Sequence, residues 1–189
     1  MKIHDQTPFS GLVKSRRSVR KFREEKVPRE VLLMCAEAAR LAPSADNSQP
    51  WRFLIVDDPD KINSIGKKIF SGIYRHTKWA LKAPVLVFIL ADLDFVAHRL
   101  GGNFQRIPFY LIDVGIAGEH FVLQAQDLGL GTCWIGWFHF KKAKQLLKIP
   151  RRYKICDILA VGYPIEGNRK RPVKRKNLDN IACFNEWTI

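Results

Sequence analysis

The sequence predicts a domain of the α+β or α/β class, with helices packed on a central sheet. Helical and extended patterns follow one another in the order helix, strand, helix, helix, strand, helix, strand, helix, strand. The 189 residues are 47% hydrophobic and 26% charged, which is ordinary globular composition. No repeat, low-complexity tract or Gly/Ser-rich linker divides the chain, so we expect one domain over residues 1–189, with residues 165–189 as a basic C-terminal tail.

The first half of the chain begins with an irregular arm up to about Ser18 and then alternates helical and extended patterns. Pro28 suits a first helical position, and the apolar pattern that it opens stops before Pro43. Residues 51–56 are an apolar run closed by Asp57-Asp58-Pro59, which predicts a strand followed by a helix start. Helical spacing then covers residues 62–69 and 74–81.

The second half contains the longest helical pattern. Residues 85–90 are continuously apolar and predict a strand buried on both faces. Residues 108–129 are apolar around the whole helix axis and end at a glycine, which predicts a central or interface helix. Two further strands, over 132–137 and 155–163, flank a short amphipathic helix over 141–147.

Positive charge is the anomaly of the composition. The chain has 32 Lys and Arg against 18 Asp and Glu, a net charge of +14. This excess favours an anionic partner, which could be nucleic acid, a membrane surface or a phosphorylated small molecule. The longest apolar run, residues 83–91, is too short to cross a bilayer, and the first residues show no secretory signal, so we expect a cytoplasmic protein.

The cysteines and histidines do not suggest metal or nucleophilic chemistry. The four cysteines are widely spaced and form no C-x-x-C pair, and the five histidines lie apart. Cys133 has no obvious activating partner in the sequence. We therefore expect no metal site and no catalytic side chain of the Cys-His type.

Three segments carry candidate binding residues. Residues 16–23 hold five basic side chains around one serine and no acid, a combination suited to phosphate, although a solvated basic turn fits equally well. Residues 42–51 cluster hydroxyl and amide groups suited to the polar edge of a heteroaromatic ring, or to a loop that satisfies its own backbone. Residues 129–136 are glycine-rich but run from helix to strand, which excludes a Rossmann fingerprint.

A fourth segment, residues 169–176, is strongly basic. It lacks aromatic residues between the charges and no nucleic-acid module accompanies it, so a solvated tail is the better interpretation. We expect no nucleic-acid partner and no membrane partner.

Five motifs in order resemble the FMN-dependent nitroreductase family. They are the RRSVRKF segment from Arg16, residues 42–51, the DVGIA segment from Asp113, residues 128–136, and Val161-Gly162-Tyr163-Pro164 before Arg175-Lys176. The resemblance implies an α+β fold of three layers, with a central, mainly antiparallel sheet flanked by helices. It also implies a homodimer whose long helices pack together and whose two FMN molecules lie between the subunits.

The resemblance assigns each motif a part of the cofactor. Arg16, Arg17, Ser18 and Arg20, joined by Arg175 of the tail, are expected to bind the phosphate and ribityl end. Polar and small residues of the second motif are expected to reach the flavin ring from the partner subunit: Pro43, Ser44, Ala45, Asn47 and Gln49. The β-strand backbone from Thr132 through Cys133, Trp134 and Ile135 to Gly136 is expected beside the ring.

The implied activity is hydride transfer from NAD(P)H to small electrophiles such as nitroaromatics and quinones, in a ping-pong order. The chemistry belongs to FMN, so no catalytic side chain is expected. Phe109, Tyr110, Trp134 and Trp137 are candidate pocket walls, with core packing as the equal alternative. Alternatives are flavin-fragmenting or dehalogenating chemistry within the family, or a basic polyanion-binding protein without activity.

Overall fold

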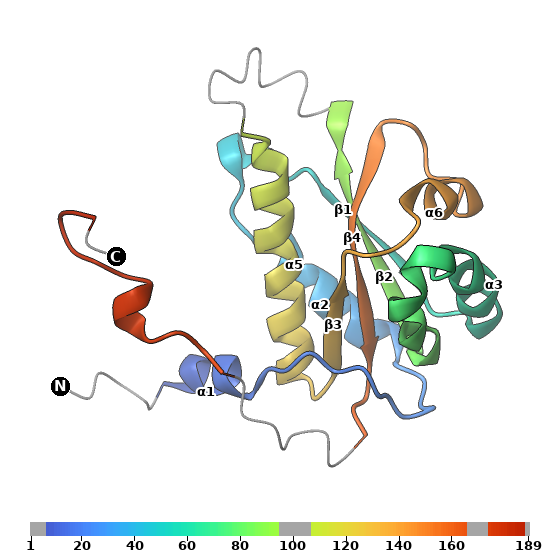
Figure 1. Ribbon diagram of the computed structural model, residues 1–189, viewed down its shortest axis with the longest axis horizontal. Coiled ribbons are helices and arrows are strands. Elements are labelled where there is room, and N and C mark those ends of the chain that lie inside the picture. The colour runs from blue at the N-terminus through green and yellow to red at the C-terminus, as the bar shows by residue number, and fades with distance from the viewer. Residues whose placement is uncertain (1–6, 95–106, 166–173, 188–189) are drawn as a thin grey trace.

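The protein folds as helices on both faces of one antiparallel sheet. The computed structural model describes residues 7–94, 107–165 and 174–187 (Figure 1). The four strands lie in the order β1-β2-β4-β3, and every neighbouring pair is antiparallel. Their bounds are Trp51–Val56 for β1, Val85–Asp92 for β2, Gly131–Ile135 for β3 and Tyr153–Gly162 for β4.

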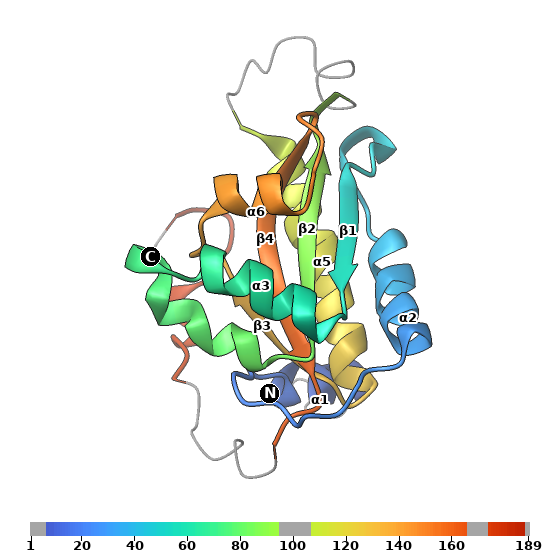
Figure 2. The ribbon, with the colours of Figure 1, turned by 90° about the vertical axis from the view of Figure 1, so that its right-hand side faces the viewer.

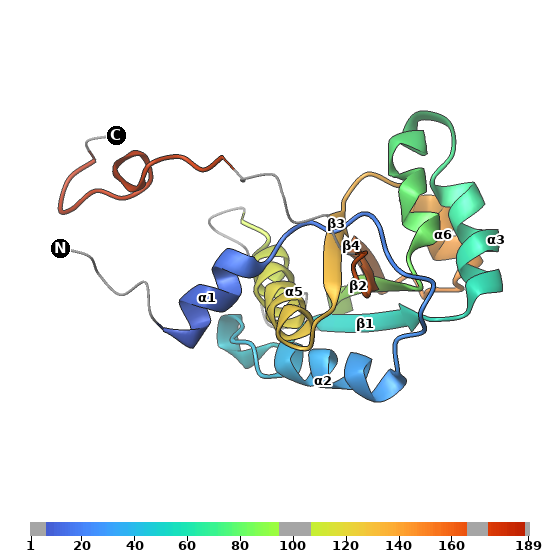
Figure 3. The same ribbon diagram turned by 90° about the horizontal axis from the view of Figure 1, so that it is seen from below.

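Two helical layers cover the sheet. One face carries α2 (Arg29–Arg40) and α5 (Phe109–Asp127), and the other carries α3 (Pro59–Ile69), η2 (Gly72–Lys82) and α6 (Phe140–Leu146) (Figures 2 and 3). The expected α+β architecture of three layers is therefore confirmed. The remaining helices are α1 (Pro8–Ser15) in the N-terminal arm, η1 (Ala45–Asn47) before β1, and η3 (Leu178–Asn180) in the tail.

Strand β2 is the centre of the core. All eight of its residues are buried, as the apolar run predicts. Leu86, Phe88 and Leu90 join the cluster under α3 and α6, whereas Val87 and Ile89 join the cluster under α2 and α5. This alternation follows from the two-residue period of a strand, so β2 contacts both helical layers.

Local signals explain where the helices begin and end. The Asp58 carboxylate accepts hydrogen bonds from the backbone N–H groups of Asp60 (2.9 Å) and Lys61 (3.2 Å) and so caps α3. Gly129 follows α5 with a φ of +77°, the left-handed conformation that glycine adopts easily after a helix. The expected helix over 108–129 is therefore confirmed nearly to its ends.

Three expectations about elements need correction. The arm before Ser18 contains α1, which the sequence analysis did not predict. The segment 74–81 is part of the longer η2, which has 3₁₀ rather than α-helical hydrogen bonding. The strand expected over 132–137 is shorter, because β3 ends at Ile135 and leaves Trp137 in a loop.

The C-terminal tail leaves the body of the protein. Its described part, residues 174–187, extends away from the sheet past α1 (Figures 1 and 3). Phe184 and Trp187 are 90% and 80% exposed. Residues 169–173 of the basic stretch lie outside the described residues.

Candidate functional site

The segment that follows α1, residues 16–23, runs beside the edge strand β3. We call this segment the arm. The Val19 N–H donates to the Thr132 carbonyl oxygen at 2.8 Å, and Ser18 forms a parallel bridge with Thr132. Val19 and Phe22 are buried and anchor the arm to the core. Because side chains of an extended segment alternate in direction, positions 16, 18 and 20 share a side opposite to that of Val19.

The side chains on that side gather at Cys133, in the middle of β3. Ser18 bridges Thr132, the residue before Cys133, and Arg20, Ser18 and Arg16 lie close enough to act on the pKa of the Cys133 thiol. Burial nevertheless raises the pKa of the thiol above its ordinary value, and the hydroxyl and the two guanidinium groups only oppose this rise. The structure therefore places Arg16, Ser18 and Arg20 near Cys133, and their role in cofactor binding stays a prediction.

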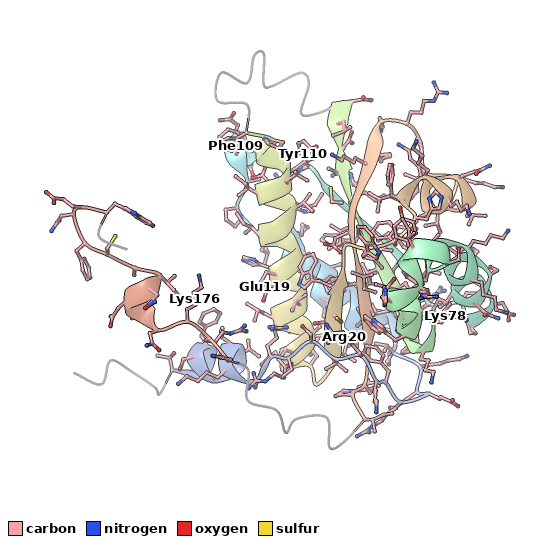
Figure 4. All side chains as sticks on the ribbon, viewed as in Figure 1. Arg20, Lys78, Phe109, Tyr110, Glu119 and Lys176 are labelled. Carbon is pink, nitrogen blue, oxygen red and sulfur yellow. The ribbon has the colours of Figure 1, made fainter. Side chains whose placement is uncertain are left out.

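Arg20 also approaches the layer formed by η2. Its guanidinium carbon lies 5.7 Å from the ring centroid of Trp79 (Figure 4 labels Arg20). The distance is typical of a cation–π contact. This contact holds Arg20 between the edge of the sheet and η2.

Arg17 lies in a different setting. Its Nη1 donates to the carbonyl oxygens of Lys14 (2.5 Å) and Arg16 (2.8 Å). With Val19 and Gln126 it lines a separate cavity of about 390 Å³, and its buried Nε has no hydrogen-bond partner among the described residues. The structure does not place Arg17 with the three neighbours that surround Cys133.

The end of β3 is held by a carboxylate that sequence reasoning missed. Asp157 Oδ1 accepts hydrogen bonds from the backbone N–H groups of Ile158 (2.7 Å) and Ile135 (3.1 Å). Burial raises the Asp157 pKa above its usual value, and the two N–H groups oppose the rise. Gly136 comes next and is exposed, with Asp157 Oδ2 3.7 Å from the position that a Cβ would take.

The loop after Gly136 is fixed to η2 through Trp137. The indole N–H donates to the Ile73 carbonyl oxygen at 3.0 Å, and the Thr77 hydroxyl donates to the Trp137 carbonyl oxygen at 2.9 Å. The Trp137 ring lies 5.3 Å from the Tyr74 ring, which in turn contacts His139. Trp137 is therefore rigidly held although it is 55% exposed.

The other aromatic residues that we considered as pocket walls lie partly in the core and partly at the surface. Trp134 packs against α5, where a Cβ added to Gly118 would lie 2.3 Å from the indole. Tyr110, at the start of α5, accepts a hydrogen bond from Lys154 Nζ at 2.9 Å. Figure 4 shows Phe109 and Tyr110 at the start of α5, far from Arg20, so these two residues do not border the segment with Arg20 within this chain.

The second motif forms a strained loop around η1. Asp46, Asn47 and Gln49 have φ values of +50°, +52° and +46°, which non-glycine residues rarely adopt. Local hydrogen bonds hold this conformation: Gln49 N–H donates to Ser44 Oγ at 2.9 Å, and Gln49 Nε2 donates to Asn47 Oδ1 at 2.9 Å. The loop therefore satisfies part of its own hydrogen bonding, as one of the two interpretations predicted.

A buried acid on α5 anchors this loop. Asp113 is 4% exposed, and its carboxylate accepts hydrogen bonds from the Ala45 N–H (3.0 Å) and the Ser48 hydroxyl (3.5 Å). Sequence reasoning did not find this role. The available signal was an acid within an otherwise apolar helical pattern.

The two groups of site residues lie at opposite ends of α5. The loop with Ser44 contacts Asp113 near the first turn, whereas the arm with Ser18 lies near the last turn and the start of β3 (Figure 1). A helix of 19 residues is about 28 Å long. One chain therefore does not bring the arm and the loop to one ligand, and Arg175 stands in the exposed tail.

Comparison with known proteins identifies the family. The model of the Nitroreductase family matches residues 13–163. A putative NADH dehydrogenase/NAD(P)H nitroreductase of Methanothermobacter thermautotrophicus is 28% identical over 82% of this chain and 76% of its own. Iodotyrosine deiodinase 1 of Rattus norvegicus is 32% identical over 92% of this chain and 68% of its own.

Solved structures agree. A nitroreductase family protein of Clostridium novyi NT has a TM-score of 0.74 and 31% identity over 87% of this chain and 89% of its own. An FMN-dependent nitroreductase of Clostridium difficile R20291 has a TM-score of 0.70 and 28% identity over 94% of this chain and 99% of its own. The chain belongs to the Nitroreductase family, whose general cofactor is FMN, and these relatives support an oxidoreductase activity.

Proposed function

We propose that the protein is an FMN-dependent oxidoreductase that transfers hydride from NAD(P)H to small electrophiles such as nitroaromatics and quinones. One observation carries the proposal. The segment that carries Arg16, Ser18 and Arg20 runs beside the edge strand β3, where the Val19 N–H donates to the Thr132 carbonyl oxygen, in a chain of the Nitroreductase family. By their resemblance to the motif of the family, we propose these three residues for the phosphate end of FMN.

The donors on the arm fit a phosphate. Guanidinium groups offer paired N–H donors to two oxygens, and the Ser18 hydroxyl adds a neutral donor. Residues 16–23 contain no acid that would compete with the ligand. Arg175 is proposed to join them from the tail, and Arg17 to contribute from its own side of the arm.

The edge of β3 suits the flavin ring. Because β3 is an edge strand, part of its backbone from Thr132 to Gly136 points away from the sheet, where it can meet a ligand. Asp157 fixes the end of this segment through the Ile135 N–H. When bound, FMN supplies hydride transfer at its N5, which is why we propose no catalytic side chain.

The remaining polar contacts are proposed to come from a second copy of the chain. The loop residues Pro43, Ser44, Ala45, Asn47 and Gln49 lie too far from the arm to serve the same ligand within one chain. A homodimer with two-fold symmetry would bring the loop of each subunit to the arm of the other. The strained loop conformation then prepares its side chains for the ring before the ligand binds.

The proposed order of substrates is ping-pong. The nicotinamide and the electrophile would use the same open face in turn, and Trp137, rigidly held beside Gly136, is the side chain best placed to border it. Two-substrate kinetics with NAD(P)H and a quinone should give parallel double-reciprocal lines. Intersecting lines would contradict the order, and a bound flavin that NAD(P)H does not bleach would contradict the activity.

A second activity is favoured by one finding. The deiodinase of Rattus norvegicus is as similar to this chain as the nitroreductases are, so reductive dehalogenation is the alternative. Chemically reduced holoprotein should be mixed with an iodinated phenol and, separately, with a nitroaromatic compound. Release of iodide without reduction of the nitro group would assign the site to dehalogenation.

A further inference from the structure

Most of the excess positive charge of the chain lies in one helical layer of the fold. Residues 61–91 and 128–156 contain 13 Lys and Arg residues and no Asp or Glu. The rest of the chain has 19 basic and 18 acidic residues, so it contributes only +1 to the total of +14. The 13 basic residues lie on α3, η2, α6 and the turn and strand start after α6: Lys61, Lys67, Lys68, Arg75, Lys78, Lys82, Lys141, Lys142, Lys144, Lys148, Arg151, Arg152 and Lys154.

All of them except Lys154, which donates to Tyr110 on α5 in the opposite layer, lie on one side of the molecule, which we call the basic face. Figure 2 looks onto the three helices that carry it, and Figure 4 shows Lys78 on η2. Twelve of the 13 residues are exposed, and the exception, Lys144, donates to the Tyr153 carbonyl oxygen. Of the acids that border this face, Asp57 pairs with Arg29 at 2.6 Å, Asp58 caps α3 and Asp92 lies 3.6 Å from Arg152, while Asp60 is exposed on the first turn of α3.

An apolar patch interrupts the basic face. Ile73, Trp137 and Phe140 are 69%, 55% and 54% exposed. A hydrogen bond and a ring contact already hold Trp137 against η2. Binding of a partner at this residue therefore does not lose free energy to the ordering of a loop. It lies between the basic residues of η2 and those of α6.

We infer that the basic face docks on a bilayer surface rich in anionic lipid headgroups. Lysine-rich clusters near aromatic and aliphatic side chains are the combination that binds such surfaces, where the charges meet headgroups and the apolar groups enter the interface. Nine of the 12 basic residues of the basic face are lysine. Lysine is depleted from protein interfaces, and nucleic-acid sites favour arginine forks and stacked aromatics.

This inference revises the expectation of no membrane partner. The contact would be with the surface alone, since no helix within the described residues is long and apolar enough to cross a membrane. The expected cytoplasmic location suits it, because the cytoplasmic leaflet is the negatively charged one. The patch shares Trp137 with the proposed substrate face, but binding to vesicles requires neither bound flavin nor turnover.

Vesicle flotation tests the inference. The purified protein is mixed with vesicles of phosphatidylcholine alone or of phosphatidylcholine with phosphatidylglycerol. We expect co-flotation with the anionic vesicles only, and release as salt shortens the Debye length from about 10 Å at 0.1 M to about 3 Å at 1 M. Equal binding to both vesicle types would overturn the inference, as would no binding to either.

Matched variants locate the contact. Each lysine near an anionic surface contributes roughly fivefold to binding, so Lys141→Glu with Lys142→Glu should lower the partition coefficient at least about 25-fold. The control, Lys174→Glu with Lys176→Glu, makes the same charge change on the tail and should retain binding. Phe140→Ser should also weaken binding, whereas Leu33→Ser on α2 should not.

Two results would contradict the assignment. An equal loss in the tail control would show that net charge, rather than the basic face, governs binding. Tighter binding to duplex DNA than to the anionic vesicles at the same salt concentration would assign the face to nucleic acid.

Discussion

Arg16 is the side chain whose removal should affect flavin binding most directly. A charge-assisted hydrogen bond contributes about 1.5–3 kcal/mol, so we expect Arg16→Ala to weaken FMN affinity by roughly tenfold to a hundredfold. The fold should survive, because Arg16 lies on the arm outside the buried core. Fluorescence titration of the apoprotein with FMN measures the effect.

The control for this change lies on the same arm. Lys21 is exposed and alternates to the side opposite Arg16, so Lys21→Ala should leave FMN affinity nearly unchanged. Unaltered flavin occupancy in both Arg16→Ala and Arg175→Ala would refute the phosphate assignment.

Asp157 should make stability depend on pH. Burial raises its pKa from the ordinary value of 3.8, so the folded protein binds more protons than the unfolded chain above that value. The contribution of Asp157 to the free energy of unfolding is therefore largest at low pH and is lost as pH rises through the raised pKa. Asp157→Asn keeps an oxygen for the N–H groups of Ile135 and Ile158 but cannot titrate.

The test compares urea unfolding of the two proteins between about pH 4 and pH 7, at one protein concentration and without FMN. The stability of the wild-type protein relative to Asp157→Asn should fall as pH rises. Parallel pH profiles would show that Asp157 does not titrate differently in the folded state.

At the scale of elements, the loop around η1 depends on α5. We expect Asp113→Ala to cost about 1–3 kcal/mol of stability, because the Ala45 N–H and the Ser48 hydroxyl lose their acceptor. Asp113→Asn should cost less, since one amide oxygen remains to accept the Ala45 N–H. Thermal unfolding measures both, with the exposed Asp127→Ala on the same helix as the control.

Most elements could be predicted because their patterns are local. The apolar run of β2 and the glycine after α5 needed no knowledge of distant residues. Helix α1 was missed because it is only eight residues long and buries none of them. The 3₁₀ form of η2 was missed because apolar spacing does not separate it from an α-helix over such a segment.

The candidate site could be predicted only in part, because some of its contacts join residues that are far apart in the sequence. The alternation of Arg16, Ser18 and Arg20 can be predicted for an extended segment, and the structure places this segment beside β3. The anchoring roles of Asp157 and Asp113 come from contacts across the fold, with Ile135 and Ala45, which sequence spacing does not reveal. Lone acids inside apolar elements are the signal to look for.

At the scale of the whole molecule, one chain holds two incomplete halves of a site. The arm lies near the last turn of α5 and the strained loop near its first turn, so neither half can complete the other. Helix α5 also keeps apolar surface free within the chain: Leu111 and Ile112 are 42% and 49% exposed. Gly115 is exposed on this helix, with no atom within 4 Å of where a Cβ would stand.

These features predict a homodimer that packs through α5. Light scattering should give about twice the 21.8 kDa mass of one chain. Gly115→Glu places a charge where we expect the partner helix, so it should yield a monomer. This monomer should also bind FMN more weakly, because the loop with Ser44 of the partner subunit no longer reaches the flavin ring. Gln145→Glu makes the same charge change on the exposed surface of α6 and should remain dimeric. A stable monomer that carries FMN would be incompatible with a site shared between two chains.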